Sequence, residues 1–103
     1  MMKVENLASK SGRVANQFHI WDTKNNIQTF QSYDSIIVTV DYDKCEITVY
    51  PKWNYSVTTN KYRNQFMSFL GFFEMATKKG FSAALKAGET QDVQGKTFKI
   101  IFA

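Results

Sequence analysis

The sequence predicts an α+β domain in which helices cover one face of an antiparallel sheet of four or five strands. Three observations predict this fold. The first half contains four short runs rich in β-branched and aromatic residues, with turns of only about four to five residues between them. A longer segment with apolar residues at helical spacing follows, and an apolar run closes the chain. The expected order is a β-meander, then a helix or helix pair, then a C-terminal strand.

Length and composition narrow the class of protein. A chain of 103 residues (residues 1–103) is expected to form a single domain, and a hydrophobic content of 44% argues against disorder. No run approaches the roughly 18 apolar residues of a membrane span. Residues 1–11 lack the apolar run of a secretory signal. The single cysteine, Cys45, excludes an internal disulfide and favours a reducing cytoplasm.

The first half is expected to be strands. Residues 1–10 are expected to form an arm or a short helix, and residues 11–51 the β-meander. The predicted strands are runs bounded by polar turns: Val14–Trp21, Ile27–Ser32, Ser35–Tyr42 and Glu46–Tyr50. The third run is the strongest, because its central residues are almost all β-branched. Pro51 cannot donate to a strand ladder and ends the fourth strand.

The helical segment is predicted over residues 58–88. Thr58 or Thr59 is the expected N-cap, because a hydroxyl there can accept from an amide of the first turn. The helix is then expected to begin near Asn60. Apolar residues three or four positions apart predict its buried face: Tyr62, Phe66, Phe69, Leu70 and Phe73.

The end of this helix is open between two alternatives. Gly71 either lies within a continuous helix or ends it early and lets a second one start. Cations followed by a glycine at Lys78–Gly80 are typical of a helix C-terminus. A short helix over Ser82–Ala87, capped by Gly88, is expected next. A polar loop and a strand over residues 97–102 complete the chain.

Known catalytic and metal-binding patterns are not found. One histidine and one cysteine exclude a structural zinc site, and a hairpin turn explains Asp41–Asp43 better than a calcium loop does. A nucleophilic pair of Cys45 and His19 is one enzymatic alternative. General acid–base catalysis by Asp34 and Asp41, the carboxylates with aromatic neighbours, is another, and nothing in the sequence singles them out. Residues 88–97 resemble a phosphate-binding loop, but six residues rather than four separate the glycines and a strand follows. We therefore expect a protein that is not an enzyme and has no metal or cofactor.

The stretch Lys52–Phe66 combines cations, aromatic rings, and hydroxyl and amide side chains. Such residues can neutralise phosphates and stack on bases, or anchor a protein interface, or form a solvated surface with Tyr62 in the core. The predicted binding residues are Lys52, Trp53, Tyr55, Thr59, Lys61, Arg63 and Asn64. Lys61 and Arg63 occupy helix positions that normally favour acidic residues, which predicts a bound anion near Thr59.

Two further features bear on this stretch. A second polar cluster consists of Gln31, Ser32, Tyr33 and Ser35, and it extends the first if the turn before the third strand lies near the helix start. Residues 51–103 hold eight Lys or Arg against three Asp or Glu, whereas residues 1–50 hold five against six. The excess indicates an anionic partner, either nucleic acid or an acidic protein face. The alternative is a merely soluble basic surface.

Three segments together resemble a family of small, uncharacterised proteins of phages and mobile elements, mainly from Gram-positive and gut bacteria: Ser11–Phe18, Phe30–Ile37 and Trp53–Phe66. The resemblance covers about residues 11–70 and brings no assigned chemistry. It implies an accessory protein in the cytoplasm of a bacterial host. Small phage proteins without catalytic motifs are often inhibitors of host defence, including anti-CRISPR proteins, which bind a nuclease or its nucleic acid stoichiometrically.

Two hypotheses follow. The first is a host-defence inhibitor of anti-CRISPR type that binds a host protein, either a nuclease or a defence complex. The second is a nucleic-acid-binding accessory protein, with Lys52, Lys61 and Arg63 on the backbone and Trp53 or Tyr55 stacked on bases. Neither involves a membrane. The oligomeric state, monomer or homodimer, is open at this point.

Overall fold

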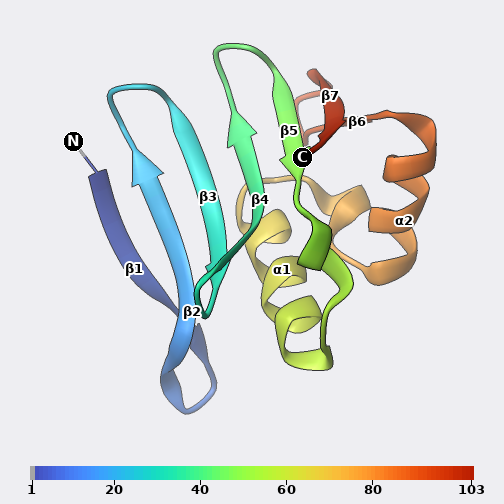
Figure 1. Ribbon diagram of the computed structural model, residues 1–103. Helices are drawn as coiled ribbons and strands as arrows, with labels where there is room; N and C mark the ends of the chain where they lie inside the picture. Colours follow the sequence, from blue (N-terminus) through green and yellow to red (C-terminus); the bar gives the residue numbers. More distant parts are fainter. Residues whose placement is uncertain (1) are drawn as a thin grey trace.

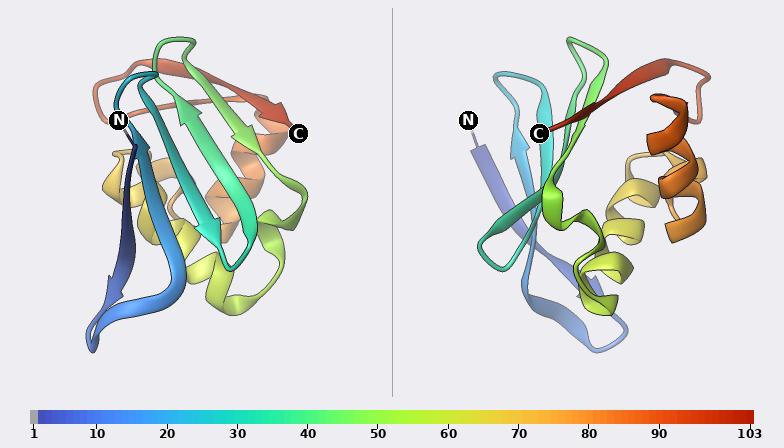
Figure 2. Two further views of the ribbon diagram at one scale, coloured as in Figure 1. Left: turned by 60° about the vertical axis from the view of Figure 1, so that its left-hand side comes forward. Right: turned by 45° about the vertical axis from the view of Figure 1, so that its right-hand side comes forward.

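The computed structural model describes residues 2–103 and shows an α+β fold with two α-helices on one side of a seven-stranded sheet (Figures 1 and 2). The strands are β1 Met2–Ser9, β2 Gly12–Asp22, β3 Ile27–Ser32, β4 Ser35–Asp41, β5 Glu46–Val49, β6 Glu89–Gln91 and β7 Thr97–Phe102. The helical elements are the 3₁₀ turn η1 Pro51–Asn54, α1 Val57–Phe69, the 3₁₀ turn η2 Phe73–Met75 and α2 Lys78–Ala87.

The sheet has the strand order β1-β2-β3-β4-β5-β7-β6. Strands β1 to β5 form an antiparallel meander, and β6 is also antiparallel to β7. Strand β7 runs parallel to β5, and such a pair needs a long crossover, which the helical region supplies. The predicted α+β class with helices on one face is confirmed, but the predicted count of four or five strands is wrong.

Two strands account for the difference. Residues 1–10 were expected to form an arm or a short helix, yet β1 pairs with β2 in regular register from Met2 to Asn6. A bulge between Asn6 and Ala8 then shifts the register, so no two-residue alternation runs through the whole strand. Strand β6 lies in the expected polar loop, where only pairing with β7 holds its polar residues extended.

Helix α1 begins earlier than predicted because Ser56 is its N-cap. The Ser56 hydroxyl accepts a hydrogen bond from the Thr59 amide at 3.1 Å, which places the first helical residue at Val57 rather than near Asn60. Thr58 and Thr59 lie inside the first turn instead of capping it. The three residues after the cap are β-branched, and their low helix propensity hid the true start.

Of the two alternatives at Gly71, the structure has the second: one helix ends there and a second helix, α2, follows before β6. Gly71 has φ of 86° and lies just after the C-cap of α1, so it ends the helix. Lys78–Gly80 is not a C-terminus: these residues open α2, where the Thr77 hydroxyl accepts from the Gly80 amide at 3.0 Å. Gly88 has φ of 77° and caps α2 as predicted.

The core lies between the sheet and the two helices. The buried residues of α1 are Thr59, Tyr62, Arg63, Phe66 and Met67. Phe66 packs on Phe30 of β3, with ring centroids 5.8 Å apart. The predicted burial of Phe69 and Phe73 is wrong, because both side chains are exposed. For Phe73 the reason is that α1 ends at Phe69, so the helical spacing does not continue to it.

Candidate functional site

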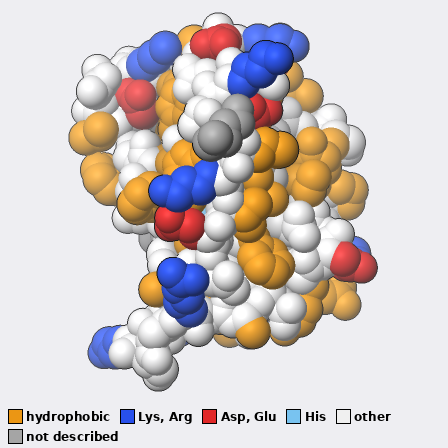
Figure 3. Space-filling view, turned by 90° about the vertical axis from the view of Figure 1, so that its left-hand side faces the viewer, with side chains coloured by type: hydrophobic (Ala, Val, Ile, Leu, Met, Phe, Trp, Pro, Cys, Tyr) orange, Lys and Arg blue, Asp and Glu red, His pale blue; other side chains and the backbone are white. Residues whose placement is uncertain are grey.

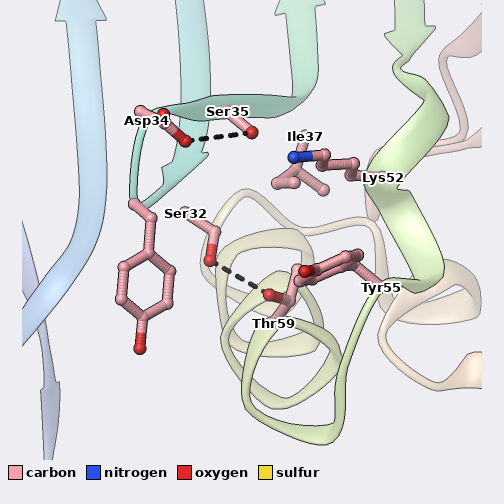
Figure 4. A pocket seen from close by; sticks show the side chains of 8 residues that line it. Ser32, Asp34, Ser35, Ile37, Lys52, Tyr55 and Thr59 are labelled. Atoms are coloured by element: carbon pink, nitrogen blue, oxygen red, sulfur yellow. Dashed lines mark hydrogen bonds between the residues drawn. The ribbon is translucent and has the colours of Figure 1, made fainter.

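A pocket of about 270 Å³ opens between the β3–β4 turn and the segment that joins η1 to α1 (Figure 4). Both chain segments supply its lining: Ser32, Tyr33, Asp34, Ser35, Ile37, Lys52, Tyr55 and Thr59. The sequence left open whether the polar cluster before the third meander strand lies near the helix start, and the structure places Ser32, Tyr33 and Ser35 of that cluster there. Two stretches that are about 20 residues apart in the chain form one surface because β4 and β5 return the chain to the same end of the sheet.

The base of the pocket is fixed by hydroxyl groups. Ser32 Oγ and Thr59 Oγ1 lie 3.0 Å apart, which joins β3 to α1 across the gap seen in Figure 4. Ser56 Oγ donates to the same Thr59 oxygen at 3.1 Å. Both Ser32 and Thr59 are buried, and Ile37 adds a buried apolar side chain beside them. The Thr59 hydroxyl is therefore occupied by hydrogen bonds to Ser32 and Ser56 at the base of the pocket and is not free to bind an anion.

Charged groups of both signs stand at the mouth. The Lys52 ammonium lies 5.2 Å from the centroid of the exposed Tyr55 ring, within cation–π range. Across the pocket, the Asp34 carboxylate accepts a hydrogen bond of 3.4 Å from the Ser35 hydroxyl. Figure 4 shows Lys52 extending from η1 over Ile37, with Asp34 and Ser35 on the facing turn.

The turn that presents Tyr33 has an unusual backbone. Tyr33 has φ of 56°, which bulky residues rarely adopt. Its amide donates to the carbonyl oxygen of Asn16 at 2.6 Å, and Asn16 itself has φ of 65°. Strained backbone of this kind persists only where its surroundings over-determine it. Here the result is an aromatic side chain held out into solvent beside the pocket.

A wider surface surrounds the pocket. A second, shallow depression shares Asp34, Ser35 and Lys52 with it. We call the combined aromatic and apolar surface, together with its lysine, the tyrosine surface: Tyr33, Ile36, Tyr50, Pro51, Lys52 and Tyr55. Tyr55 is 71% exposed, and Tyr33 and Ile36 are exposed as well.

Arg63 lies elsewhere, in a fully buried position. Its guanidinium donates to the backbone oxygen of Trp53 at 2.6 Å and to the side-chain oxygens of Asn60 and Asn64 at 3.1 and 3.0 Å. It also lies 4.4 Å from the ring centroid of Phe81 in α2. Burial lowers the pKa of the Arg63 guanidinium to about 10, so it keeps its charge near neutral pH.

The seven predicted site residues therefore separate into three groups. Lys52, Tyr55 and Thr59 line the pocket. Arg63 is buried, and the partly buried Trp53 and Asn64 accept its hydrogen bonds. Lys61 is exposed beside Tyr62, 5.3 Å from its ring centroid. The expected anion site near Thr59, Lys61 and Arg63 is not assembled. The Thr59 amide is taken by the Ser56 cap, and the Arg63 guanidinium points into the core.

Three residues of the tyrosine surface had no part in the predicted site: Ile36, Tyr50 and Pro51. Ile36 belongs to the strongest predicted strand, and a register shift at Phe30/Gln31 on the paired β3 leaves it exposed. Strand alternation does not reveal such a shift. The available signal was Pro51, because a proline directly after a strand marks a point where the chain leaves the sheet.

The Cys45 and His19 pair is not assembled. His19 is buried on β2 and donates from Nε2 to Gln28 Oε1 at 2.6 Å, whereas Cys45 lies near the Tyr42 carbonyl with Sγ 3.7 Å from that oxygen. Within residues 2–103, no group of three or more His, Cys, Asp or Glu side chains is placed to hold a metal ion. None of the helices in this range is long and apolar enough to cross a membrane.

Comparison with known proteins places the chain in a family. A family model described as a family of unknown function, DUF8033, matches residues 2–83, well over half of the sequence. The match includes every residue of the tyrosine surface and ends within α2. Neither the curated proteins nor the solved structures give a significant match. This chain belongs to the DUF8033 family of unknown function.

Proposed function

We propose that this protein acts by binding another protein through the tyrosine surface. The observation that carries the proposal is the exposure of aromatic and apolar side chains around a polar pocket on a small domain. Tyrosine combines an apolar ring with a hydroxyl group, and it is a typical anchor residue of protein interfaces. Three of them, Tyr33, Tyr50 and Tyr55, contribute to the tyrosine surface here.

Rigidity supports the same proposal. The Ser32–Thr59 bond joins β3 to α1 at the base of the pocket, and the Tyr33 amide is held by the Asn16 carbonyl. A surface fixed in this way loses little conformational entropy on binding, and this leaves more of the contact energy as affinity. The pocket is large enough to receive one side chain of a partner.

The charges favour a protein partner over a nucleic acid. Lys52 and Asp34 stand at the same pocket, so a phosphate near the lysine would also meet a carboxylate. A protein partner can offer groups of both signs, whereas a phosphate backbone offers only one. Of the groups expected to contact nucleic acid, Arg63 is buried and Trp53 stacks on Phe81 with centroids 5.2 Å apart.

The resemblance to small proteins of phages and mobile elements supplies the class of partner. On that ground we place the protein in a bacterial cytoplasm as a stoichiometric inhibitor of a host defence system, of anti-CRISPR type. Its partner would be a host nuclease or another nucleic-acid-handling protein of the defence complex. The inhibitor needs no catalytic group, because occupation of the partner's working surface is sufficient.

The test measures phage survival and partner capture together. In a bacterial host with an active nuclease-based defence, the wild-type protein should restore plaque formation by a targeted phage and retain one host protein at equal molar amounts. Tyr55→Ala and Lys52→Glu should lose both effects. Phe73→Ala removes another exposed ring at a separate pocket and should keep them. Unchanged plaque counts and no retained host protein with the wild type would refute the proposal.

A second candidate, nucleic-acid binding, is favoured by one observation. The Lys52 ammonium lies over an exposed Tyr55 ring, and Lys61 is exposed one helical turn beyond the first residues of α1. This arrangement can neutralise a phosphate and stack on a base. Fluorescence polarisation with labelled single-stranded DNA, duplex DNA and RNA tests it at low and near-physiological salt. Binding that persists, with a salt slope that falls by about one unit in Lys52→Gln, would favour this candidate.

A further inference from the structure

The edge of the sheet formed by β1 is open. Strand β1 is terminal in the strand order, and its residues 2–6 pair regularly with β2. An edge strand presents N–H and C=O groups that can accept another strand. Figure 3 faces this edge and shows a column of hydrophobic side chains beside Lys or Arg and Asp or Glu side chains. We propose that two copies of this chain pair through β1 in antiparallel orientation, centred on Val4.

Charge complementarity selects this occupant and this register. Lys3 and Glu5 are two residues apart on one face of β1, exposed, with their charged groups 3.3 Å apart. In an antiparallel pair centred on Val4, Lys3 of each copy stands opposite Glu5 of the other. Centring on residue 3 or 5 instead sets like charges opposite each other, and so does parallel in-register pairing. Opposite charges directly across a strand pair stabilise it, and like charges destabilise it.

The other face of β1 carries apolar side chains that a monomer leaves in water. Met2 is 65% and Val4 58% exposed, and Val4 is paired with Ile20 of β2. In the proposed dimer Val4 meets its own copy across the two-fold axis. Ile20 and Val4 of one copy then lie side by side with Val4 and Ile20 of the other, on the same face of the joined sheet. This contact removes apolar surface from water.

The geometry of the described part of the strand agrees with this centre. The bulge between Asn6 and Ala8 ends the regular part of β1, so five residues, 2–6, remain straight. Their middle residue is Val4. Within these five residues the strand has no proline and no bulge, which are two of the devices that block edge-to-edge pairing. Charged side chains are a third device, and in this register Lys3 and Glu5 attract their counterparts instead of repelling them.

A charge-reversal cycle on the full chain tests the proposal, with sedimentation equilibrium as the readout. The wild type should be a dimer that dissociates on dilution. Lys3→Glu and Glu5→Lys should each raise the dimer dissociation constant about tenfold or more, because each puts like charges across the axis. The double variant should return to the wild-type value. An equimolar mixture of the two single variants should form heterodimers, since every facing pair is then attractive.

Lys10→Glu is the matched control, because it makes the same change of charge at an exposed position beyond the straight part of β1. It should leave the dissociation constant within about twofold of the wild type. Circular dichroism melts of dilute samples verify that each variant folds. A wild type that stays monomeric at millimolar concentration would overturn the proposal, and so would single variants that dimerise like the wild type. The tyrosine surface is unchanged in all of these variants, so the outcome is independent of partner binding.

Discussion

The guanidinium of Arg63 is buried against two aromatic rings, and its two terminal nitrogens donate to neutral oxygens rather than to a carboxylate, while its Nε has no hydrogen-bond partner. Burying a charge is costly unless its donors are hydrogen-bonded, and here three bonds offset part of that cost while the Nε donor stays unpaired. The bond to the Trp53 carbonyl and the contact with Phe81 connect η1, α1 and α2. Arg63 therefore stabilises the fold, although its residue type and its position in the sequence predicted that it binds a partner.

Replacing Arg63 should destabilise the fold more than replacing its exposed neighbour. Arg63→Ala removes the packing of the guanidinium against the two rings and leaves the Trp53 carbonyl unpaired, for an expected loss of about 3 kcal/mol in the free energy of unfolding. Lys61→Ala, on the exposed side of the same helix, should change it by less than about 0.5 kcal/mol. Urea unfolding monitored by tryptophan fluorescence measures both. Equal losses in the two variants would contradict the buried placement of Arg63.

His19 should make stability depend on pH. Burial lowers the pKa of His19 below its ordinary value of 6.5, although the hydrogen bond with Gln28 and the nearby Glu5 act in the opposite direction. Below pH 6.5 the unfolded chain therefore binds more protons than the folded protein, and the free energy of unfolding falls as the pH falls. One proton sets the upper limit of this slope at about 1.4 kcal/mol per pH unit.

Urea unfolding at pH 7.5 and pH 5.5 measures this contribution. His19→Gln, which does not titrate, should lose less stability between the two pH values than the wild type does. The comparison with His19→Gln cancels the pH dependence that the two proteins share, so the difference between them reports His19. If the wild type and His19→Gln show the same pH dependence, His19 is not held neutral in the folded protein.

At the scale of elements, the strands with a strong local sequence pattern could be predicted, and those without one could not. The four meander strands and the final strand were found close to their true positions, because β-branched runs between polar turns are a strong local signal. Strand β1 was missed because a bulge breaks its alternation, and β6 because three polar residues become a strand only beside β7. Both depend on partners distant in sequence, which a local pattern does not contain.

The candidate site was predictable in the same partial way. Lys52, Tyr55 and the Ser32–Ser35 turn were identified from composition, and they do line one pocket. Arg63 and Trp53 were assigned to the same surface because they are close in sequence. Arg63 instead lies on the side of α1 that faces α2, where its guanidinium contacts Phe81. Helical periodicity shows that a residue is buried, but it does not show whether the residue faces the sheet or another helix.

Gly80 yields a prediction about α2. A Cβ at this position would overlap the carbonyl oxygen of Glu74, so α2 packs on η2 at a distance that only glycine allows. Gly80→Ala should therefore destabilise the protein by about 1–3 kcal/mol, even though alanine favours helix by about 1 kcal/mol. Lys79→Ala, exposed in the same turn, should be within about 0.5 kcal/mol of the wild type. Thermal and urea unfolding compare the two, and a stabilised Gly80→Ala would contradict this packing.

At the scale of the whole molecule, the fold is larger than the segment that the family model matches. The match ends at residue 83, within α2, yet β7 lies between β5 and β6 in the sheet. Phe98 of β7 is fully buried, with its ring centroid 5.0 Å from that of Phe72 and 5.7 Å from that of Tyr42. The residues after the match therefore complete the core and are not an appendage.

A chain of residues 1–83 should consequently fail to fold. Without β7, this chain would expose β5, Phe72 and the part of the core that Phe98 and Ile100 cover. The apolar surface lost from the core in this way is large enough to decide whether a small domain is stable. Circular dichroism should show no cooperative melt for residues 1–83, whereas the full chain melts cooperatively. Phe98→Ala in the full chain tests the same contact less drastically and should cost about 3–5 kcal/mol. A cooperative transition in the 1–83 fragment would mean that the matched segment is an independent folding unit and that β7 merely docks on it.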